Sequence, residues 1–314
     1  MVVPALQIVS REQGNNSALK DGSIHPAGFS FAFEEVPVLV HAFRRMVRTL
    51  EFEVCEMALT TYLCARDHGV PFSGLPIFLK RAFHHGAILH NIKFGLENPK
   101  NLEGQRVGVN RGYTVTAGVW ARGVLQEEYG VDLSKITWVL SGDEHVEKYK
   151  PPGNVVSIER GKTIDELLDS GDLAAAINIE STGSNIQPLI PNPLEAGITA
   201  FKDRGHYPIN HLIVVRDTVM KEHPGVDVAI FNAFAEAKNI YLERLRTGEI
   251  ESPTSVDEFH LRMMGLMGDP LPYGIGPNHA VLQNLIKNAE AQKILRKPIE
   301  IESVFTKGTL ELTA

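Results

Sequence analysis

Cysteine is scarce in this chain of 314 residues, which contains only Cys55 and Cys64. Two cysteines nine positions apart give neither the spacing of a zinc site nor a disulfide framework. We therefore expect both to be free thiols buried in a core.

Long hydrophobic runs are missing as well. No apolar stretch reaches the length of about 18 residues that a membrane-spanning helix needs. The first residues lack the basic start, the apolar centre and the small-residue cleavage site of a secretory signal. We expect a cytoplasmic protein without a membrane partner.

Positive charge is not in excess: 31 lysines and arginines face 38 aspartates and glutamates, and the formal net charge is −7. This balance argues against a nucleic-acid partner, although a local basic pocket would not show in the sum. The chain also has no Gly-rich dinucleotide fingerprint, no Walker loop and no Gly-x-Ser-x-Gly elbow. Nicotinamide, nucleotide and serine-hydrolase chemistries are therefore disfavoured.

What the sequence does contain is a series of strands that alternate with helices, which is typical of α/β architecture. The length exceeds what one hydrophobic core usually reaches. Connections rich in turn-forming or polar residues, at 97–104 and 201–208, bound a central insert. We expect a bilobal α/β clamp with two crossing segments, in which residues 1–103 and 205–314 form one lobe and residues 104–204 the other.

The stretch VGVNRGYTVTAGVWARG at 107–123 reads as a strand that turns into a helix. A helix start has unpaired N–H groups and the positive end of the helix dipole, so it attracts anions. Together with Arg111, Thr114 and Thr116 it predicts a carboxylate-binding site. The alternative is ordinary helix capping beside a solvated arginine.

Glu56 lies at the carboxyl end of the strand expected at 52–55, and ligands of open α/β sheets bind at such ends. There it would serve as a proton donor or base. An equally good interpretation is a first-turn glutamate that complements the helix dipole.

Arg81, His84, His85 and His90 form the densest cationic cluster in the chain. Imidazoles near neutrality suit proton transfer, and a guanidinium binds a carboxylate through two hydrogen bonds. Each histidine could instead be a hydrogen-bonded structural side chain. A metal site completed by Glu56 and His211 is another alternative, although no spacing in the sequence demands one.

Two further segments offer contacts to a ligand. Tyr207 and His211 fall at the second expected crossing, where a clamp would place residues that touch both ligand and hinge. Ser181 opens the donor-rich segment STGSN after an expected strand. A core histidine and an ordinary surface turn are the simpler interpretations of these two features.

Five segments give the chain a resemblance to a known family: FEVCEMALTTYL (52–63), RAFHHGAILHN (81–91), GQRVGVNRGYTVTAGVWARGVLQEEYGV (104–131), YPINHLIVVRDTVMKEHPGV (207–226) and DPLPYGIGPNHAVL (269–282). In this order and spacing they resemble the 4,5-dihydroxyphthalate decarboxylases, which are relatives of the type II periplasmic binding proteins. The resemblance implies a bilobal binding-protein fold. It also implies loss of carbon dioxide from a hydroxylated benzene dicarboxylate.

The resulting hypothesis is an aromatic-acid decarboxylase, a carboxy-lyase, that protonates a ring carbon. Its proton carriers would be Glu56, His84 and His211, and the substrate would be held by Arg81, His85, Arg111, Thr114, Thr116, Ser181 and Tyr207. No cofactor is expected, while a divalent metal and a homo-oligomer stay open. The main alternative is a solute-binding protein for a small anionic ligand. A pyrimidine-precursor synthase of thiamine biosynthesis ranks last, because the expected histidine- and cysteine-rich motif is missing.

Overall fold

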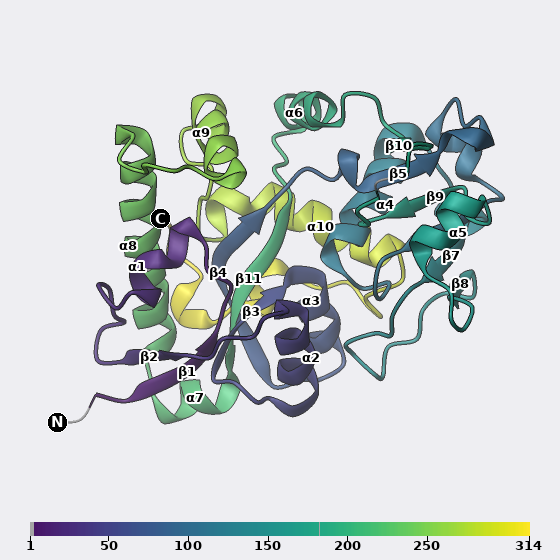
Figure 1. Ribbon diagram of the computed structural model, residues 1–314. Coiled ribbons are helices and arrows are strands. Elements are labelled where there is room, and N and C mark those ends of the chain that lie inside the picture. Colours follow the sequence, from purple (N-terminus) through teal and green to yellow (C-terminus); the bar gives the residue numbers. More distant parts are fainter. Residues whose placement is uncertain (1–2, 182) are drawn as a thin grey trace.

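The structure is a computed structural model that describes residues 3–181 and 183–314. Two mixed β-sheets, each covered by helices, form two halves that lie side by side (Figure 1). This confirms the expected α/β fold with two lobes. Among the described residues, no helix combines the length and the apolarity that crossing a bilayer requires.

The first sheet has five strands in the spatial order β2 (Ser30–Phe33), β1 (Ala5–Val9), β3 (Val54–Ala58), β11 (Ile209–Arg216) and β4 (Phe72–Arg81). Strand β1 runs parallel to β2 and β3, whereas β11 is antiparallel to both of its neighbours. The strand β11 therefore returns the chain to the first sheet after it has built the second one.

The second sheet has six strands in the order β10 (Ile186–Pro188), β5 (Ile88–Asn91), β9 (Ala175–Ile177), β6 (Arg106–Val109), β7 (Thr137–Leu140) and β8 (Val155–Ser157). The strands β9, β6, β7 and β8 are parallel. Their carboxyl ends consequently meet at one edge of the sheet, where ligands of such sheets bind.

One strand lies in a different sheet from the one expected. Residues 1–103 were assigned to the first lobe, but β5 pairs with β9 and β10 in the second sheet. The polar connection at 97–104 forms a short 3-10 helix, Pro99–Leu102, capped by Asn98. Composition identifies a turn but does not distinguish a turn within a lobe from a crossing between lobes. The first crossing thus falls between Arg81 and Ile88, and the lobe limits as such stay a prediction.

The helices are α1 (Ser17–Lys20), α2 (Leu39–Thr49), α3 (Leu59–Asp67), α4 (Thr116–Tyr129), α5 (Ile164–Ser170), α6 (Pro193–Arg204), α7 (Asp217–Glu222), α8 (Val226–Thr247), α9 (Ser255–Met267) and α10 (His279–Ala291). Their ends follow local sequence rules. Capping boxes begin α5 at Thr163 and α9 at Thr254, because each of these hydroxyls accepts a hydrogen bond from the third residue of its helix. Gly130, with φ of 64°, ends α4 in the left-handed conformation that glycine adopts without strain.

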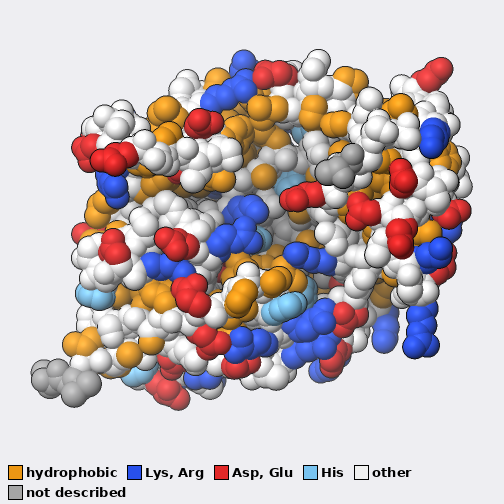
Figure 2. Space-filling model, in the orientation of Figure 1, with side chains coloured by type: hydrophobic (Ala, Val, Ile, Leu, Met, Phe, Trp, Pro, Cys, Tyr) orange, Lys and Arg blue, Asp and Glu red, His pale blue; other side chains and the backbone are white. Residues whose placement is uncertain are grey.

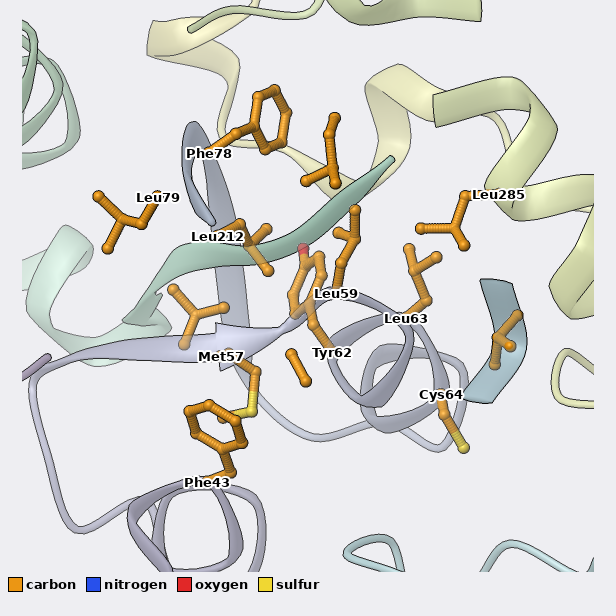
Figure 3. Packing of buried hydrophobic residues seen from close by; sticks show 14 of the residues in the cluster. Phe43, Met57, Leu59, Tyr62, Leu63, Cys64, Phe78, Leu79, Leu212 and Leu285 are labelled. Atoms are coloured by element: carbon orange, nitrogen blue, oxygen red, sulfur yellow. The ribbon is translucent and has the colours of Figure 1, made fainter. Parts of the chain in front are cut away.

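The core continues from the first sheet to the C-terminal helix. Leu59 and Leu63 of α3 are buried, and Leu285 of α10 packs near them (Figure 3). On α4, the buried Arg122 donates through Nε to Oε1 of Gln292, just beyond α10, at 2.8 Å. The helix α3 follows a strand of the first sheet, and α4 follows a strand of the second. Both therefore contact the same C-terminal segment, α10 and the residue after it. Cys55 and Cys64 are free and buried, which confirms that expectation.

Candidate functional site

A cavity of about 490 Å³ lies where residues from the two sheets meet. Its polar lining residues include Arg11, Lys80, Asn110, Arg111, His145, Asn178, Glu180, Asn210 and His211. Several of them come within two positions of the carboxyl end of a strand: Arg11 follows β1, Arg111 follows β6 and Asn178 follows β9. Figure 2 shows a hollow near the middle of the face that is turned toward the viewer, with basic side chains beside it.

Three cations in this lining are unpaired. The side chains of Arg11, Lys80 and Arg111 form no ion pair with a carboxylate within the residues that the structure describes. Burial, and then the nearby positive charge of Arg11, lower the pKa of Lys80 and of Arg111. A ligand with negative charge would relieve this repulsion, so the cavity is suited to a carboxylate.

The backbone of Arg111 is held in an unusual conformation. Its φ is 73°, in the left-handed region that non-glycine residues rarely adopt. Its N–H donates to Oγ of Ser141 at 2.7 Å, which fixes the turn after β6. Strained backbone of this kind often occurs where a side chain must be aimed at a ligand. Arg111 lines the cavity, and its role in binding a ligand stays a prediction.

Glu56 and His211 form a buried pair on neighbouring strands. In the β3–β11 register, His211 is opposite Ala58 and Ile213 is opposite Glu56, so Glu56 and His211 are diagonal neighbours on one face. Oε1 of Glu56 lies 2.6 Å from Nδ1 of His211, and its Oε2 accepts from the N–H of Arg11 at 2.9 Å. Glu56 is fully buried and His211 lines the cavity.

This pairing decides which nitrogen of His211 is available. Burial lowers the pKa of His211, although the hydrogen bond and charge of Glu56 act in the opposite direction. In the neutral ring, Nδ1 carries the hydrogen that it donates to Glu56, and Nε2 keeps its lone pair. Of the two side chains only His211 lines the cavity, and Glu56 lies behind it. Glu56 was expected to move protons itself, which its position behind His211 does not support.

The starts of α3 and α4 meet beside the cavity. The N–H of Thr60 donates to Oγ1 of Thr116 at 2.9 Å, and the hydroxyl of Thr60 donates to the carbonyl of Thr114 at 2.7 Å. Thr116 lines the cavity although its hydroxyl is occupied by α3. Thr61 also lines it, and its buried hydroxyl has no partner within the described part of the chain. Thr61 is therefore the hydroxyl of this junction that is free to bind a ligand.

Thr114 does not contribute to the cavity. Its hydroxyl donates to Oε2 of Glu144 at 2.6 Å, and the N–H groups of Tyr113 and Thr114 bind the same carboxylate. The turn before α4 does hold a carboxylate, as its sequence suggested, but the protein supplies that carboxylate itself. The sequence does not show this pairing, because Glu144 comes 30 positions after Thr114.

The cationic cluster at 81–90 is divided rather than gathered at the cavity. Arg81 is buried and donates to the carbonyls of Tyr207 and Pro272 at 2.9 and 3.2 Å and to Oδ1 of Asn278. Strand alternation puts Lys80 and Arg81 on opposite faces, so only Lys80 reaches the cavity. Arg81 consequently stabilises loops instead of binding a ligand there.

His84 and His85 are also occupied by protein partners. Nε2 of His84 is 3.1 Å from Oδ1 of Asn210, and Nε2 of His85 is 2.9 Å from Oε2 of Glu128, which also binds Arg204. Neither histidine lines the cavity between the sheets; both line a smaller pocket beside α4 and α6. Their expected catalytic and binding roles are not supported by these positions.

Tyr207 and Ser181 lie away from the cavity lining as well. The ring of Tyr207 is buried against Phe83 and Phe201, with its carbonyl bound to Arg81. Oγ of Ser181 accepts from the N–H of Gly183 at 3.3 Å.

In residues 3–181 and 183–314, no three His, Cys, Asp or Glu side chains are grouped closely enough to hold a metal ion.

Comparisons with known proteins give this site its context. No family model matches the chain. It is 30% identical over 288 residues to the 4,5-dihydroxyphthalate decarboxylase of Comamonas testosteroni. The aligned region covers 86% of each of the two chains. The chain belongs to the 4,5-dihydroxyphthalate decarboxylase family. A second enzyme of that name, from Pseudomonas putida, is 35% identical over 143 residues, 43% of this chain and 55% of the relative.

The fold of this decarboxylase-family member is that of the periplasmic binding proteins. The periplasmic aliphatic sulphonate-binding protein SsuA from Escherichia coli superposes with a TM-score of 0.56 and covers 98% of this chain and 94% of its own. The sequence identity is only 11%. This likeness confirms the binding-protein fold, and the family relation makes the chain a member of a group of carboxy-lyases.

Several cavity residues were missed from the sequence, among them Arg11, Lys80, Thr61, His145 and Asn178. Arg11 could have been found, because it stands two positions after a strand whose carboxyl end faces the cleft. Lys80 could have been preferred over Arg81 only with the face of β4 known. His145 lies outside any strand or helix, so no periodic signal places it.

Three buried histidines predict loss of stability in acid. Burial lowers the pKa of His84, His145 and His260 to about 4 in each case, from an ordinary value near 6.5. Between these values the unfolded chain binds protons that the folded chain does not, so stability falls as pH falls. Each histidine contributes a slope of up to about 1.4 kcal/mol per pH unit.

Urea unfolding at pH 7.5, 6 and 5 measures this slope. We expect His145→Gln to reduce it, whereas His279→Gln, at an exposed position, leaves it unchanged. A free energy of unfolding that is flat from pH 7.5 to pH 5 would contradict the assignment of these three histidines as neutral.

Proposed function

We propose that the chain is an aromatic-acid decarboxylase that removes carbon dioxide from a hydroxylated benzene carboxylate or dicarboxylate bound in the cavity between the sheets. The observation that carries this proposal is the juxtaposition of His211, held by buried Glu56, with three unpaired cations in one cavity. Membership of the 4,5-dihydroxyphthalate decarboxylase family supports the class of substrate.

Substrate binding uses the charges of the cavity. Arg11 and Arg111 bind carboxylate oxygens through their planar guanidinium groups, which can donate two hydrogen bonds at once. The free hydroxyl of Thr61 provides a further donor. Closure of the two lobes over the ring excludes water and strengthens these interactions.

The reaction needs one proton removed from the ring's hydroxyl group and one delivered to the ring carbon. In 4,5-dihydroxyphthalate each carboxylated carbon has a hydroxyl in the para position. Nε2 of His211 takes the hydroxyl proton, and the freed electron pair moves through the ring to the carboxylated carbon, where a C–H bond forms. The C–C bond then breaks, carbon dioxide leaves, and its bonding pair restores the aromatic ring and the oxygen anion. His211 returns the proton to that oxygen.

Lys80 is the donor to the ring carbon in this scheme. Of the three cations it is the one that can release a proton, since an arginine stays protonated in proteins. Its pKa is lowered by burial and by Arg11, which makes the ammonium a stronger acid than an ordinary lysine. The proton that Lys80 delivers is replaced from water, so the net reaction exchanges a carboxylate for a hydrogen.

A carbon dioxide release assay tests the proposal with 4,5-dihydroxyphthalate and a set of hydroxylated benzoates. Ala117→Trp places a bulky ring in the cavity, where Ala117 forms part of the lining, and is expected to abolish release. Leu194→Trp, on the exposed surface of α6, is the matched control and is expected to release carbon dioxide at the unaltered rate.

The second candidate is a solute-binding protein, favoured by the fold that the chain shares with SsuA. Under this alternative the same cavity captures an anionic aromatic acid without changing it. A ligand-dependent rise in melting temperature that Ala117→Trp removes, with no carbon dioxide from any of the acids, would establish binding and reject the decarboxylase.

A further inference from the structure

A second hollow of about 540 Å³ adjoins the cavity. We name it the α8–α9 groove, because residues of both helices line it: Tyr241 and Arg244 of α8, and Val256, Asp257 and His260 of α9. Residues 11–15, Ser17 and residues 79–81 complete the lining on the other side. In Figure 1, α8 and α9 stand next to each other on the side of the first sheet. Arg11 and Lys80 line both spaces and therefore separate the groove from the cavity.

The floor of the groove contains a buried chain of hydrogen bonds that the decarboxylation scheme does not use. The hydroxyl of Tyr241 lies 2.6 Å from Oδ1 of Asp257 and 2.9 Å from Nδ1 of His260. All three side chains are buried. Oδ2 of Asp257 is already occupied by the N–H and the hydroxyl of Thr254, at the start of α9.

The directions of these hydrogen bonds can be assigned. Burial alone would raise the pKa of Asp257, but hydrogen bonds from Tyr241 and Thr254 outweigh it and the pKa is lowered. An ionised carboxylate only accepts, so Tyr241 donates to Asp257 and must accept from Nδ1 of His260. Burial lowers the pKa of His260 to about 4, so the ring is neutral and its remaining nitrogen, Nε2, is an acceptor. The groove thus has an oriented acceptor, which suits a hydroxyl group.

The walls add apolar surface and positive charge. Leu79, Ile250 and Val256 line the groove, and Val256, at 58%, is the most exposed large hydrophobic side chain among the residues that the structure describes. Arg244 lines it too and forms no ion pair within the described ranges. Two carboxylates of the lining, Glu12 and the ionised Asp257, oppose this positive charge, but the cations of the lining outnumber them. Those cations are Arg11, Lys80, Arg81 and Arg244.

We propose that the α8–α9 groove is a second binding site for a hydroxylated aromatic carboxylate. The ring lies against Val256 and Ile250, a ring hydroxyl donates to His260, and the carboxylate is bound by Arg244 and Arg11. The ligand class rests on the proposed function, because the groove is matched to the acids that the cavity would convert. Since Arg11 and Lys80 serve both spaces, a ligand in the groove changes the charges available to a ligand in the cavity, and the two sites are coupled.

The probe for this site is 3,4-dihydroxybenzoate, the acid that remains when 4,5-dihydroxyphthalate loses one carboxyl group. Isothermal titration calorimetry is expected to show two molecules bound per chain. Val256→Trp fills the groove and is expected to reduce this to one. Leu261→Trp, at another exposed position of α9 outside the groove lining, is the matched control and is expected to keep both. Arg244→Gln is expected to weaken one of the two affinities by about tenfold.

A single binding event in the unaltered chain, or two events that persist in Val256→Trp, would overturn the second site. These outcomes are separate from those of the proposed function. Carbon dioxide release together with a single binding event supports the decarboxylase and rejects the groove. Loss of one of two binding events in Val256→Trp, without carbon dioxide release by the unaltered chain, supports the groove and rejects the decarboxylase.

Discussion

His211→Leu is expected to lower kcat for carbon dioxide release by about 10²- to 10⁴-fold, the usual contribution of a general base. The variant has no lone pair to take the hydroxyl proton, while Arg11 and Arg111 still hold the substrate. Binding of 4,5-dihydroxyphthalate, measured by calorimetry, should therefore change much less than turnover. His41→Leu, on the exposed side of α2, controls for loss of a histidine elsewhere and should retain full activity.

The role of Glu56 is distinguished from that of His211 by the pH profile. Glu56→Gln keeps an oxygen that can accept from Nδ1 of His211 but removes the charge that stabilises the protonated ring. We expect a smaller loss of kcat than in His211→Leu and a shift of the acid limb of the profile to lower pH. Turnover in His211→Leu at the unaltered rate would contradict the assignment of His211 as the base.

Lys80→Arg is expected to lower kcat by about 10²-fold or more, with KM changed only a few-fold. Arginine keeps the positive charge in the cavity but does not release a proton to the ring carbon. Steady-state kinetics with 4,5-dihydroxyphthalate measure both constants.

Two further variants show whether the effect belongs to proton delivery. Arg111→Gln removes a carboxylate-binding group and should mainly raise KM, because it weakens binding before and during the reaction alike. Arg246→Gln, whose side chain is exposed and paired with Glu243 on α8, should leave both constants unchanged. A Lys80→Arg enzyme with unaltered kcat would show that lysine supplies charge alone.

The family and the two-lobed fold could be predicted from the sequence, because the blocks that carry them are local and ordered along the chain. Arg111 was proposed from the turn before a helix start and His211 from the second crossing, and both line the cavity. Glu56 was expected at the carboxyl end of a strand over 52–55, but it lies in the middle of β3 (Val54–Ala58). Whether such a carboxylate faces the ligand or supports the histidine depends on the register of β3 with β11, which pairs segments 155 positions apart.

Long-range partners explain the other differences. Arg81 looked like a substrate anchor, yet its acceptors come from Tyr207, Pro272 and Asn278, at least 126 positions later. His85 is likewise bound by Glu128 of α4. Local composition indicates that a cation is present, but only the tertiary fold determines whether a protein group already neutralises or solvates it. Within the described part of the chain, Arg11, Lys80 and Arg111 are cations of the cavity lining that have no such partner.

Decarboxylation in the cavity is tested most directly by a reaction of 4,5-dihydroxyphthalate in deuterium oxide, with the product examined by proton NMR. We expect carbon dioxide and 3,4-dihydroxybenzoate with one deuterium at C6. This is the carbon that the carboxylate left, and it lies para to the 3-hydroxyl. Ala117→Trp and His211→Leu should show almost none of this product in the same time. Recovery of unchanged 4,5-dihydroxyphthalate from a chain that binds it tightly would contradict decarboxylation and show that this cavity only captures its ligand.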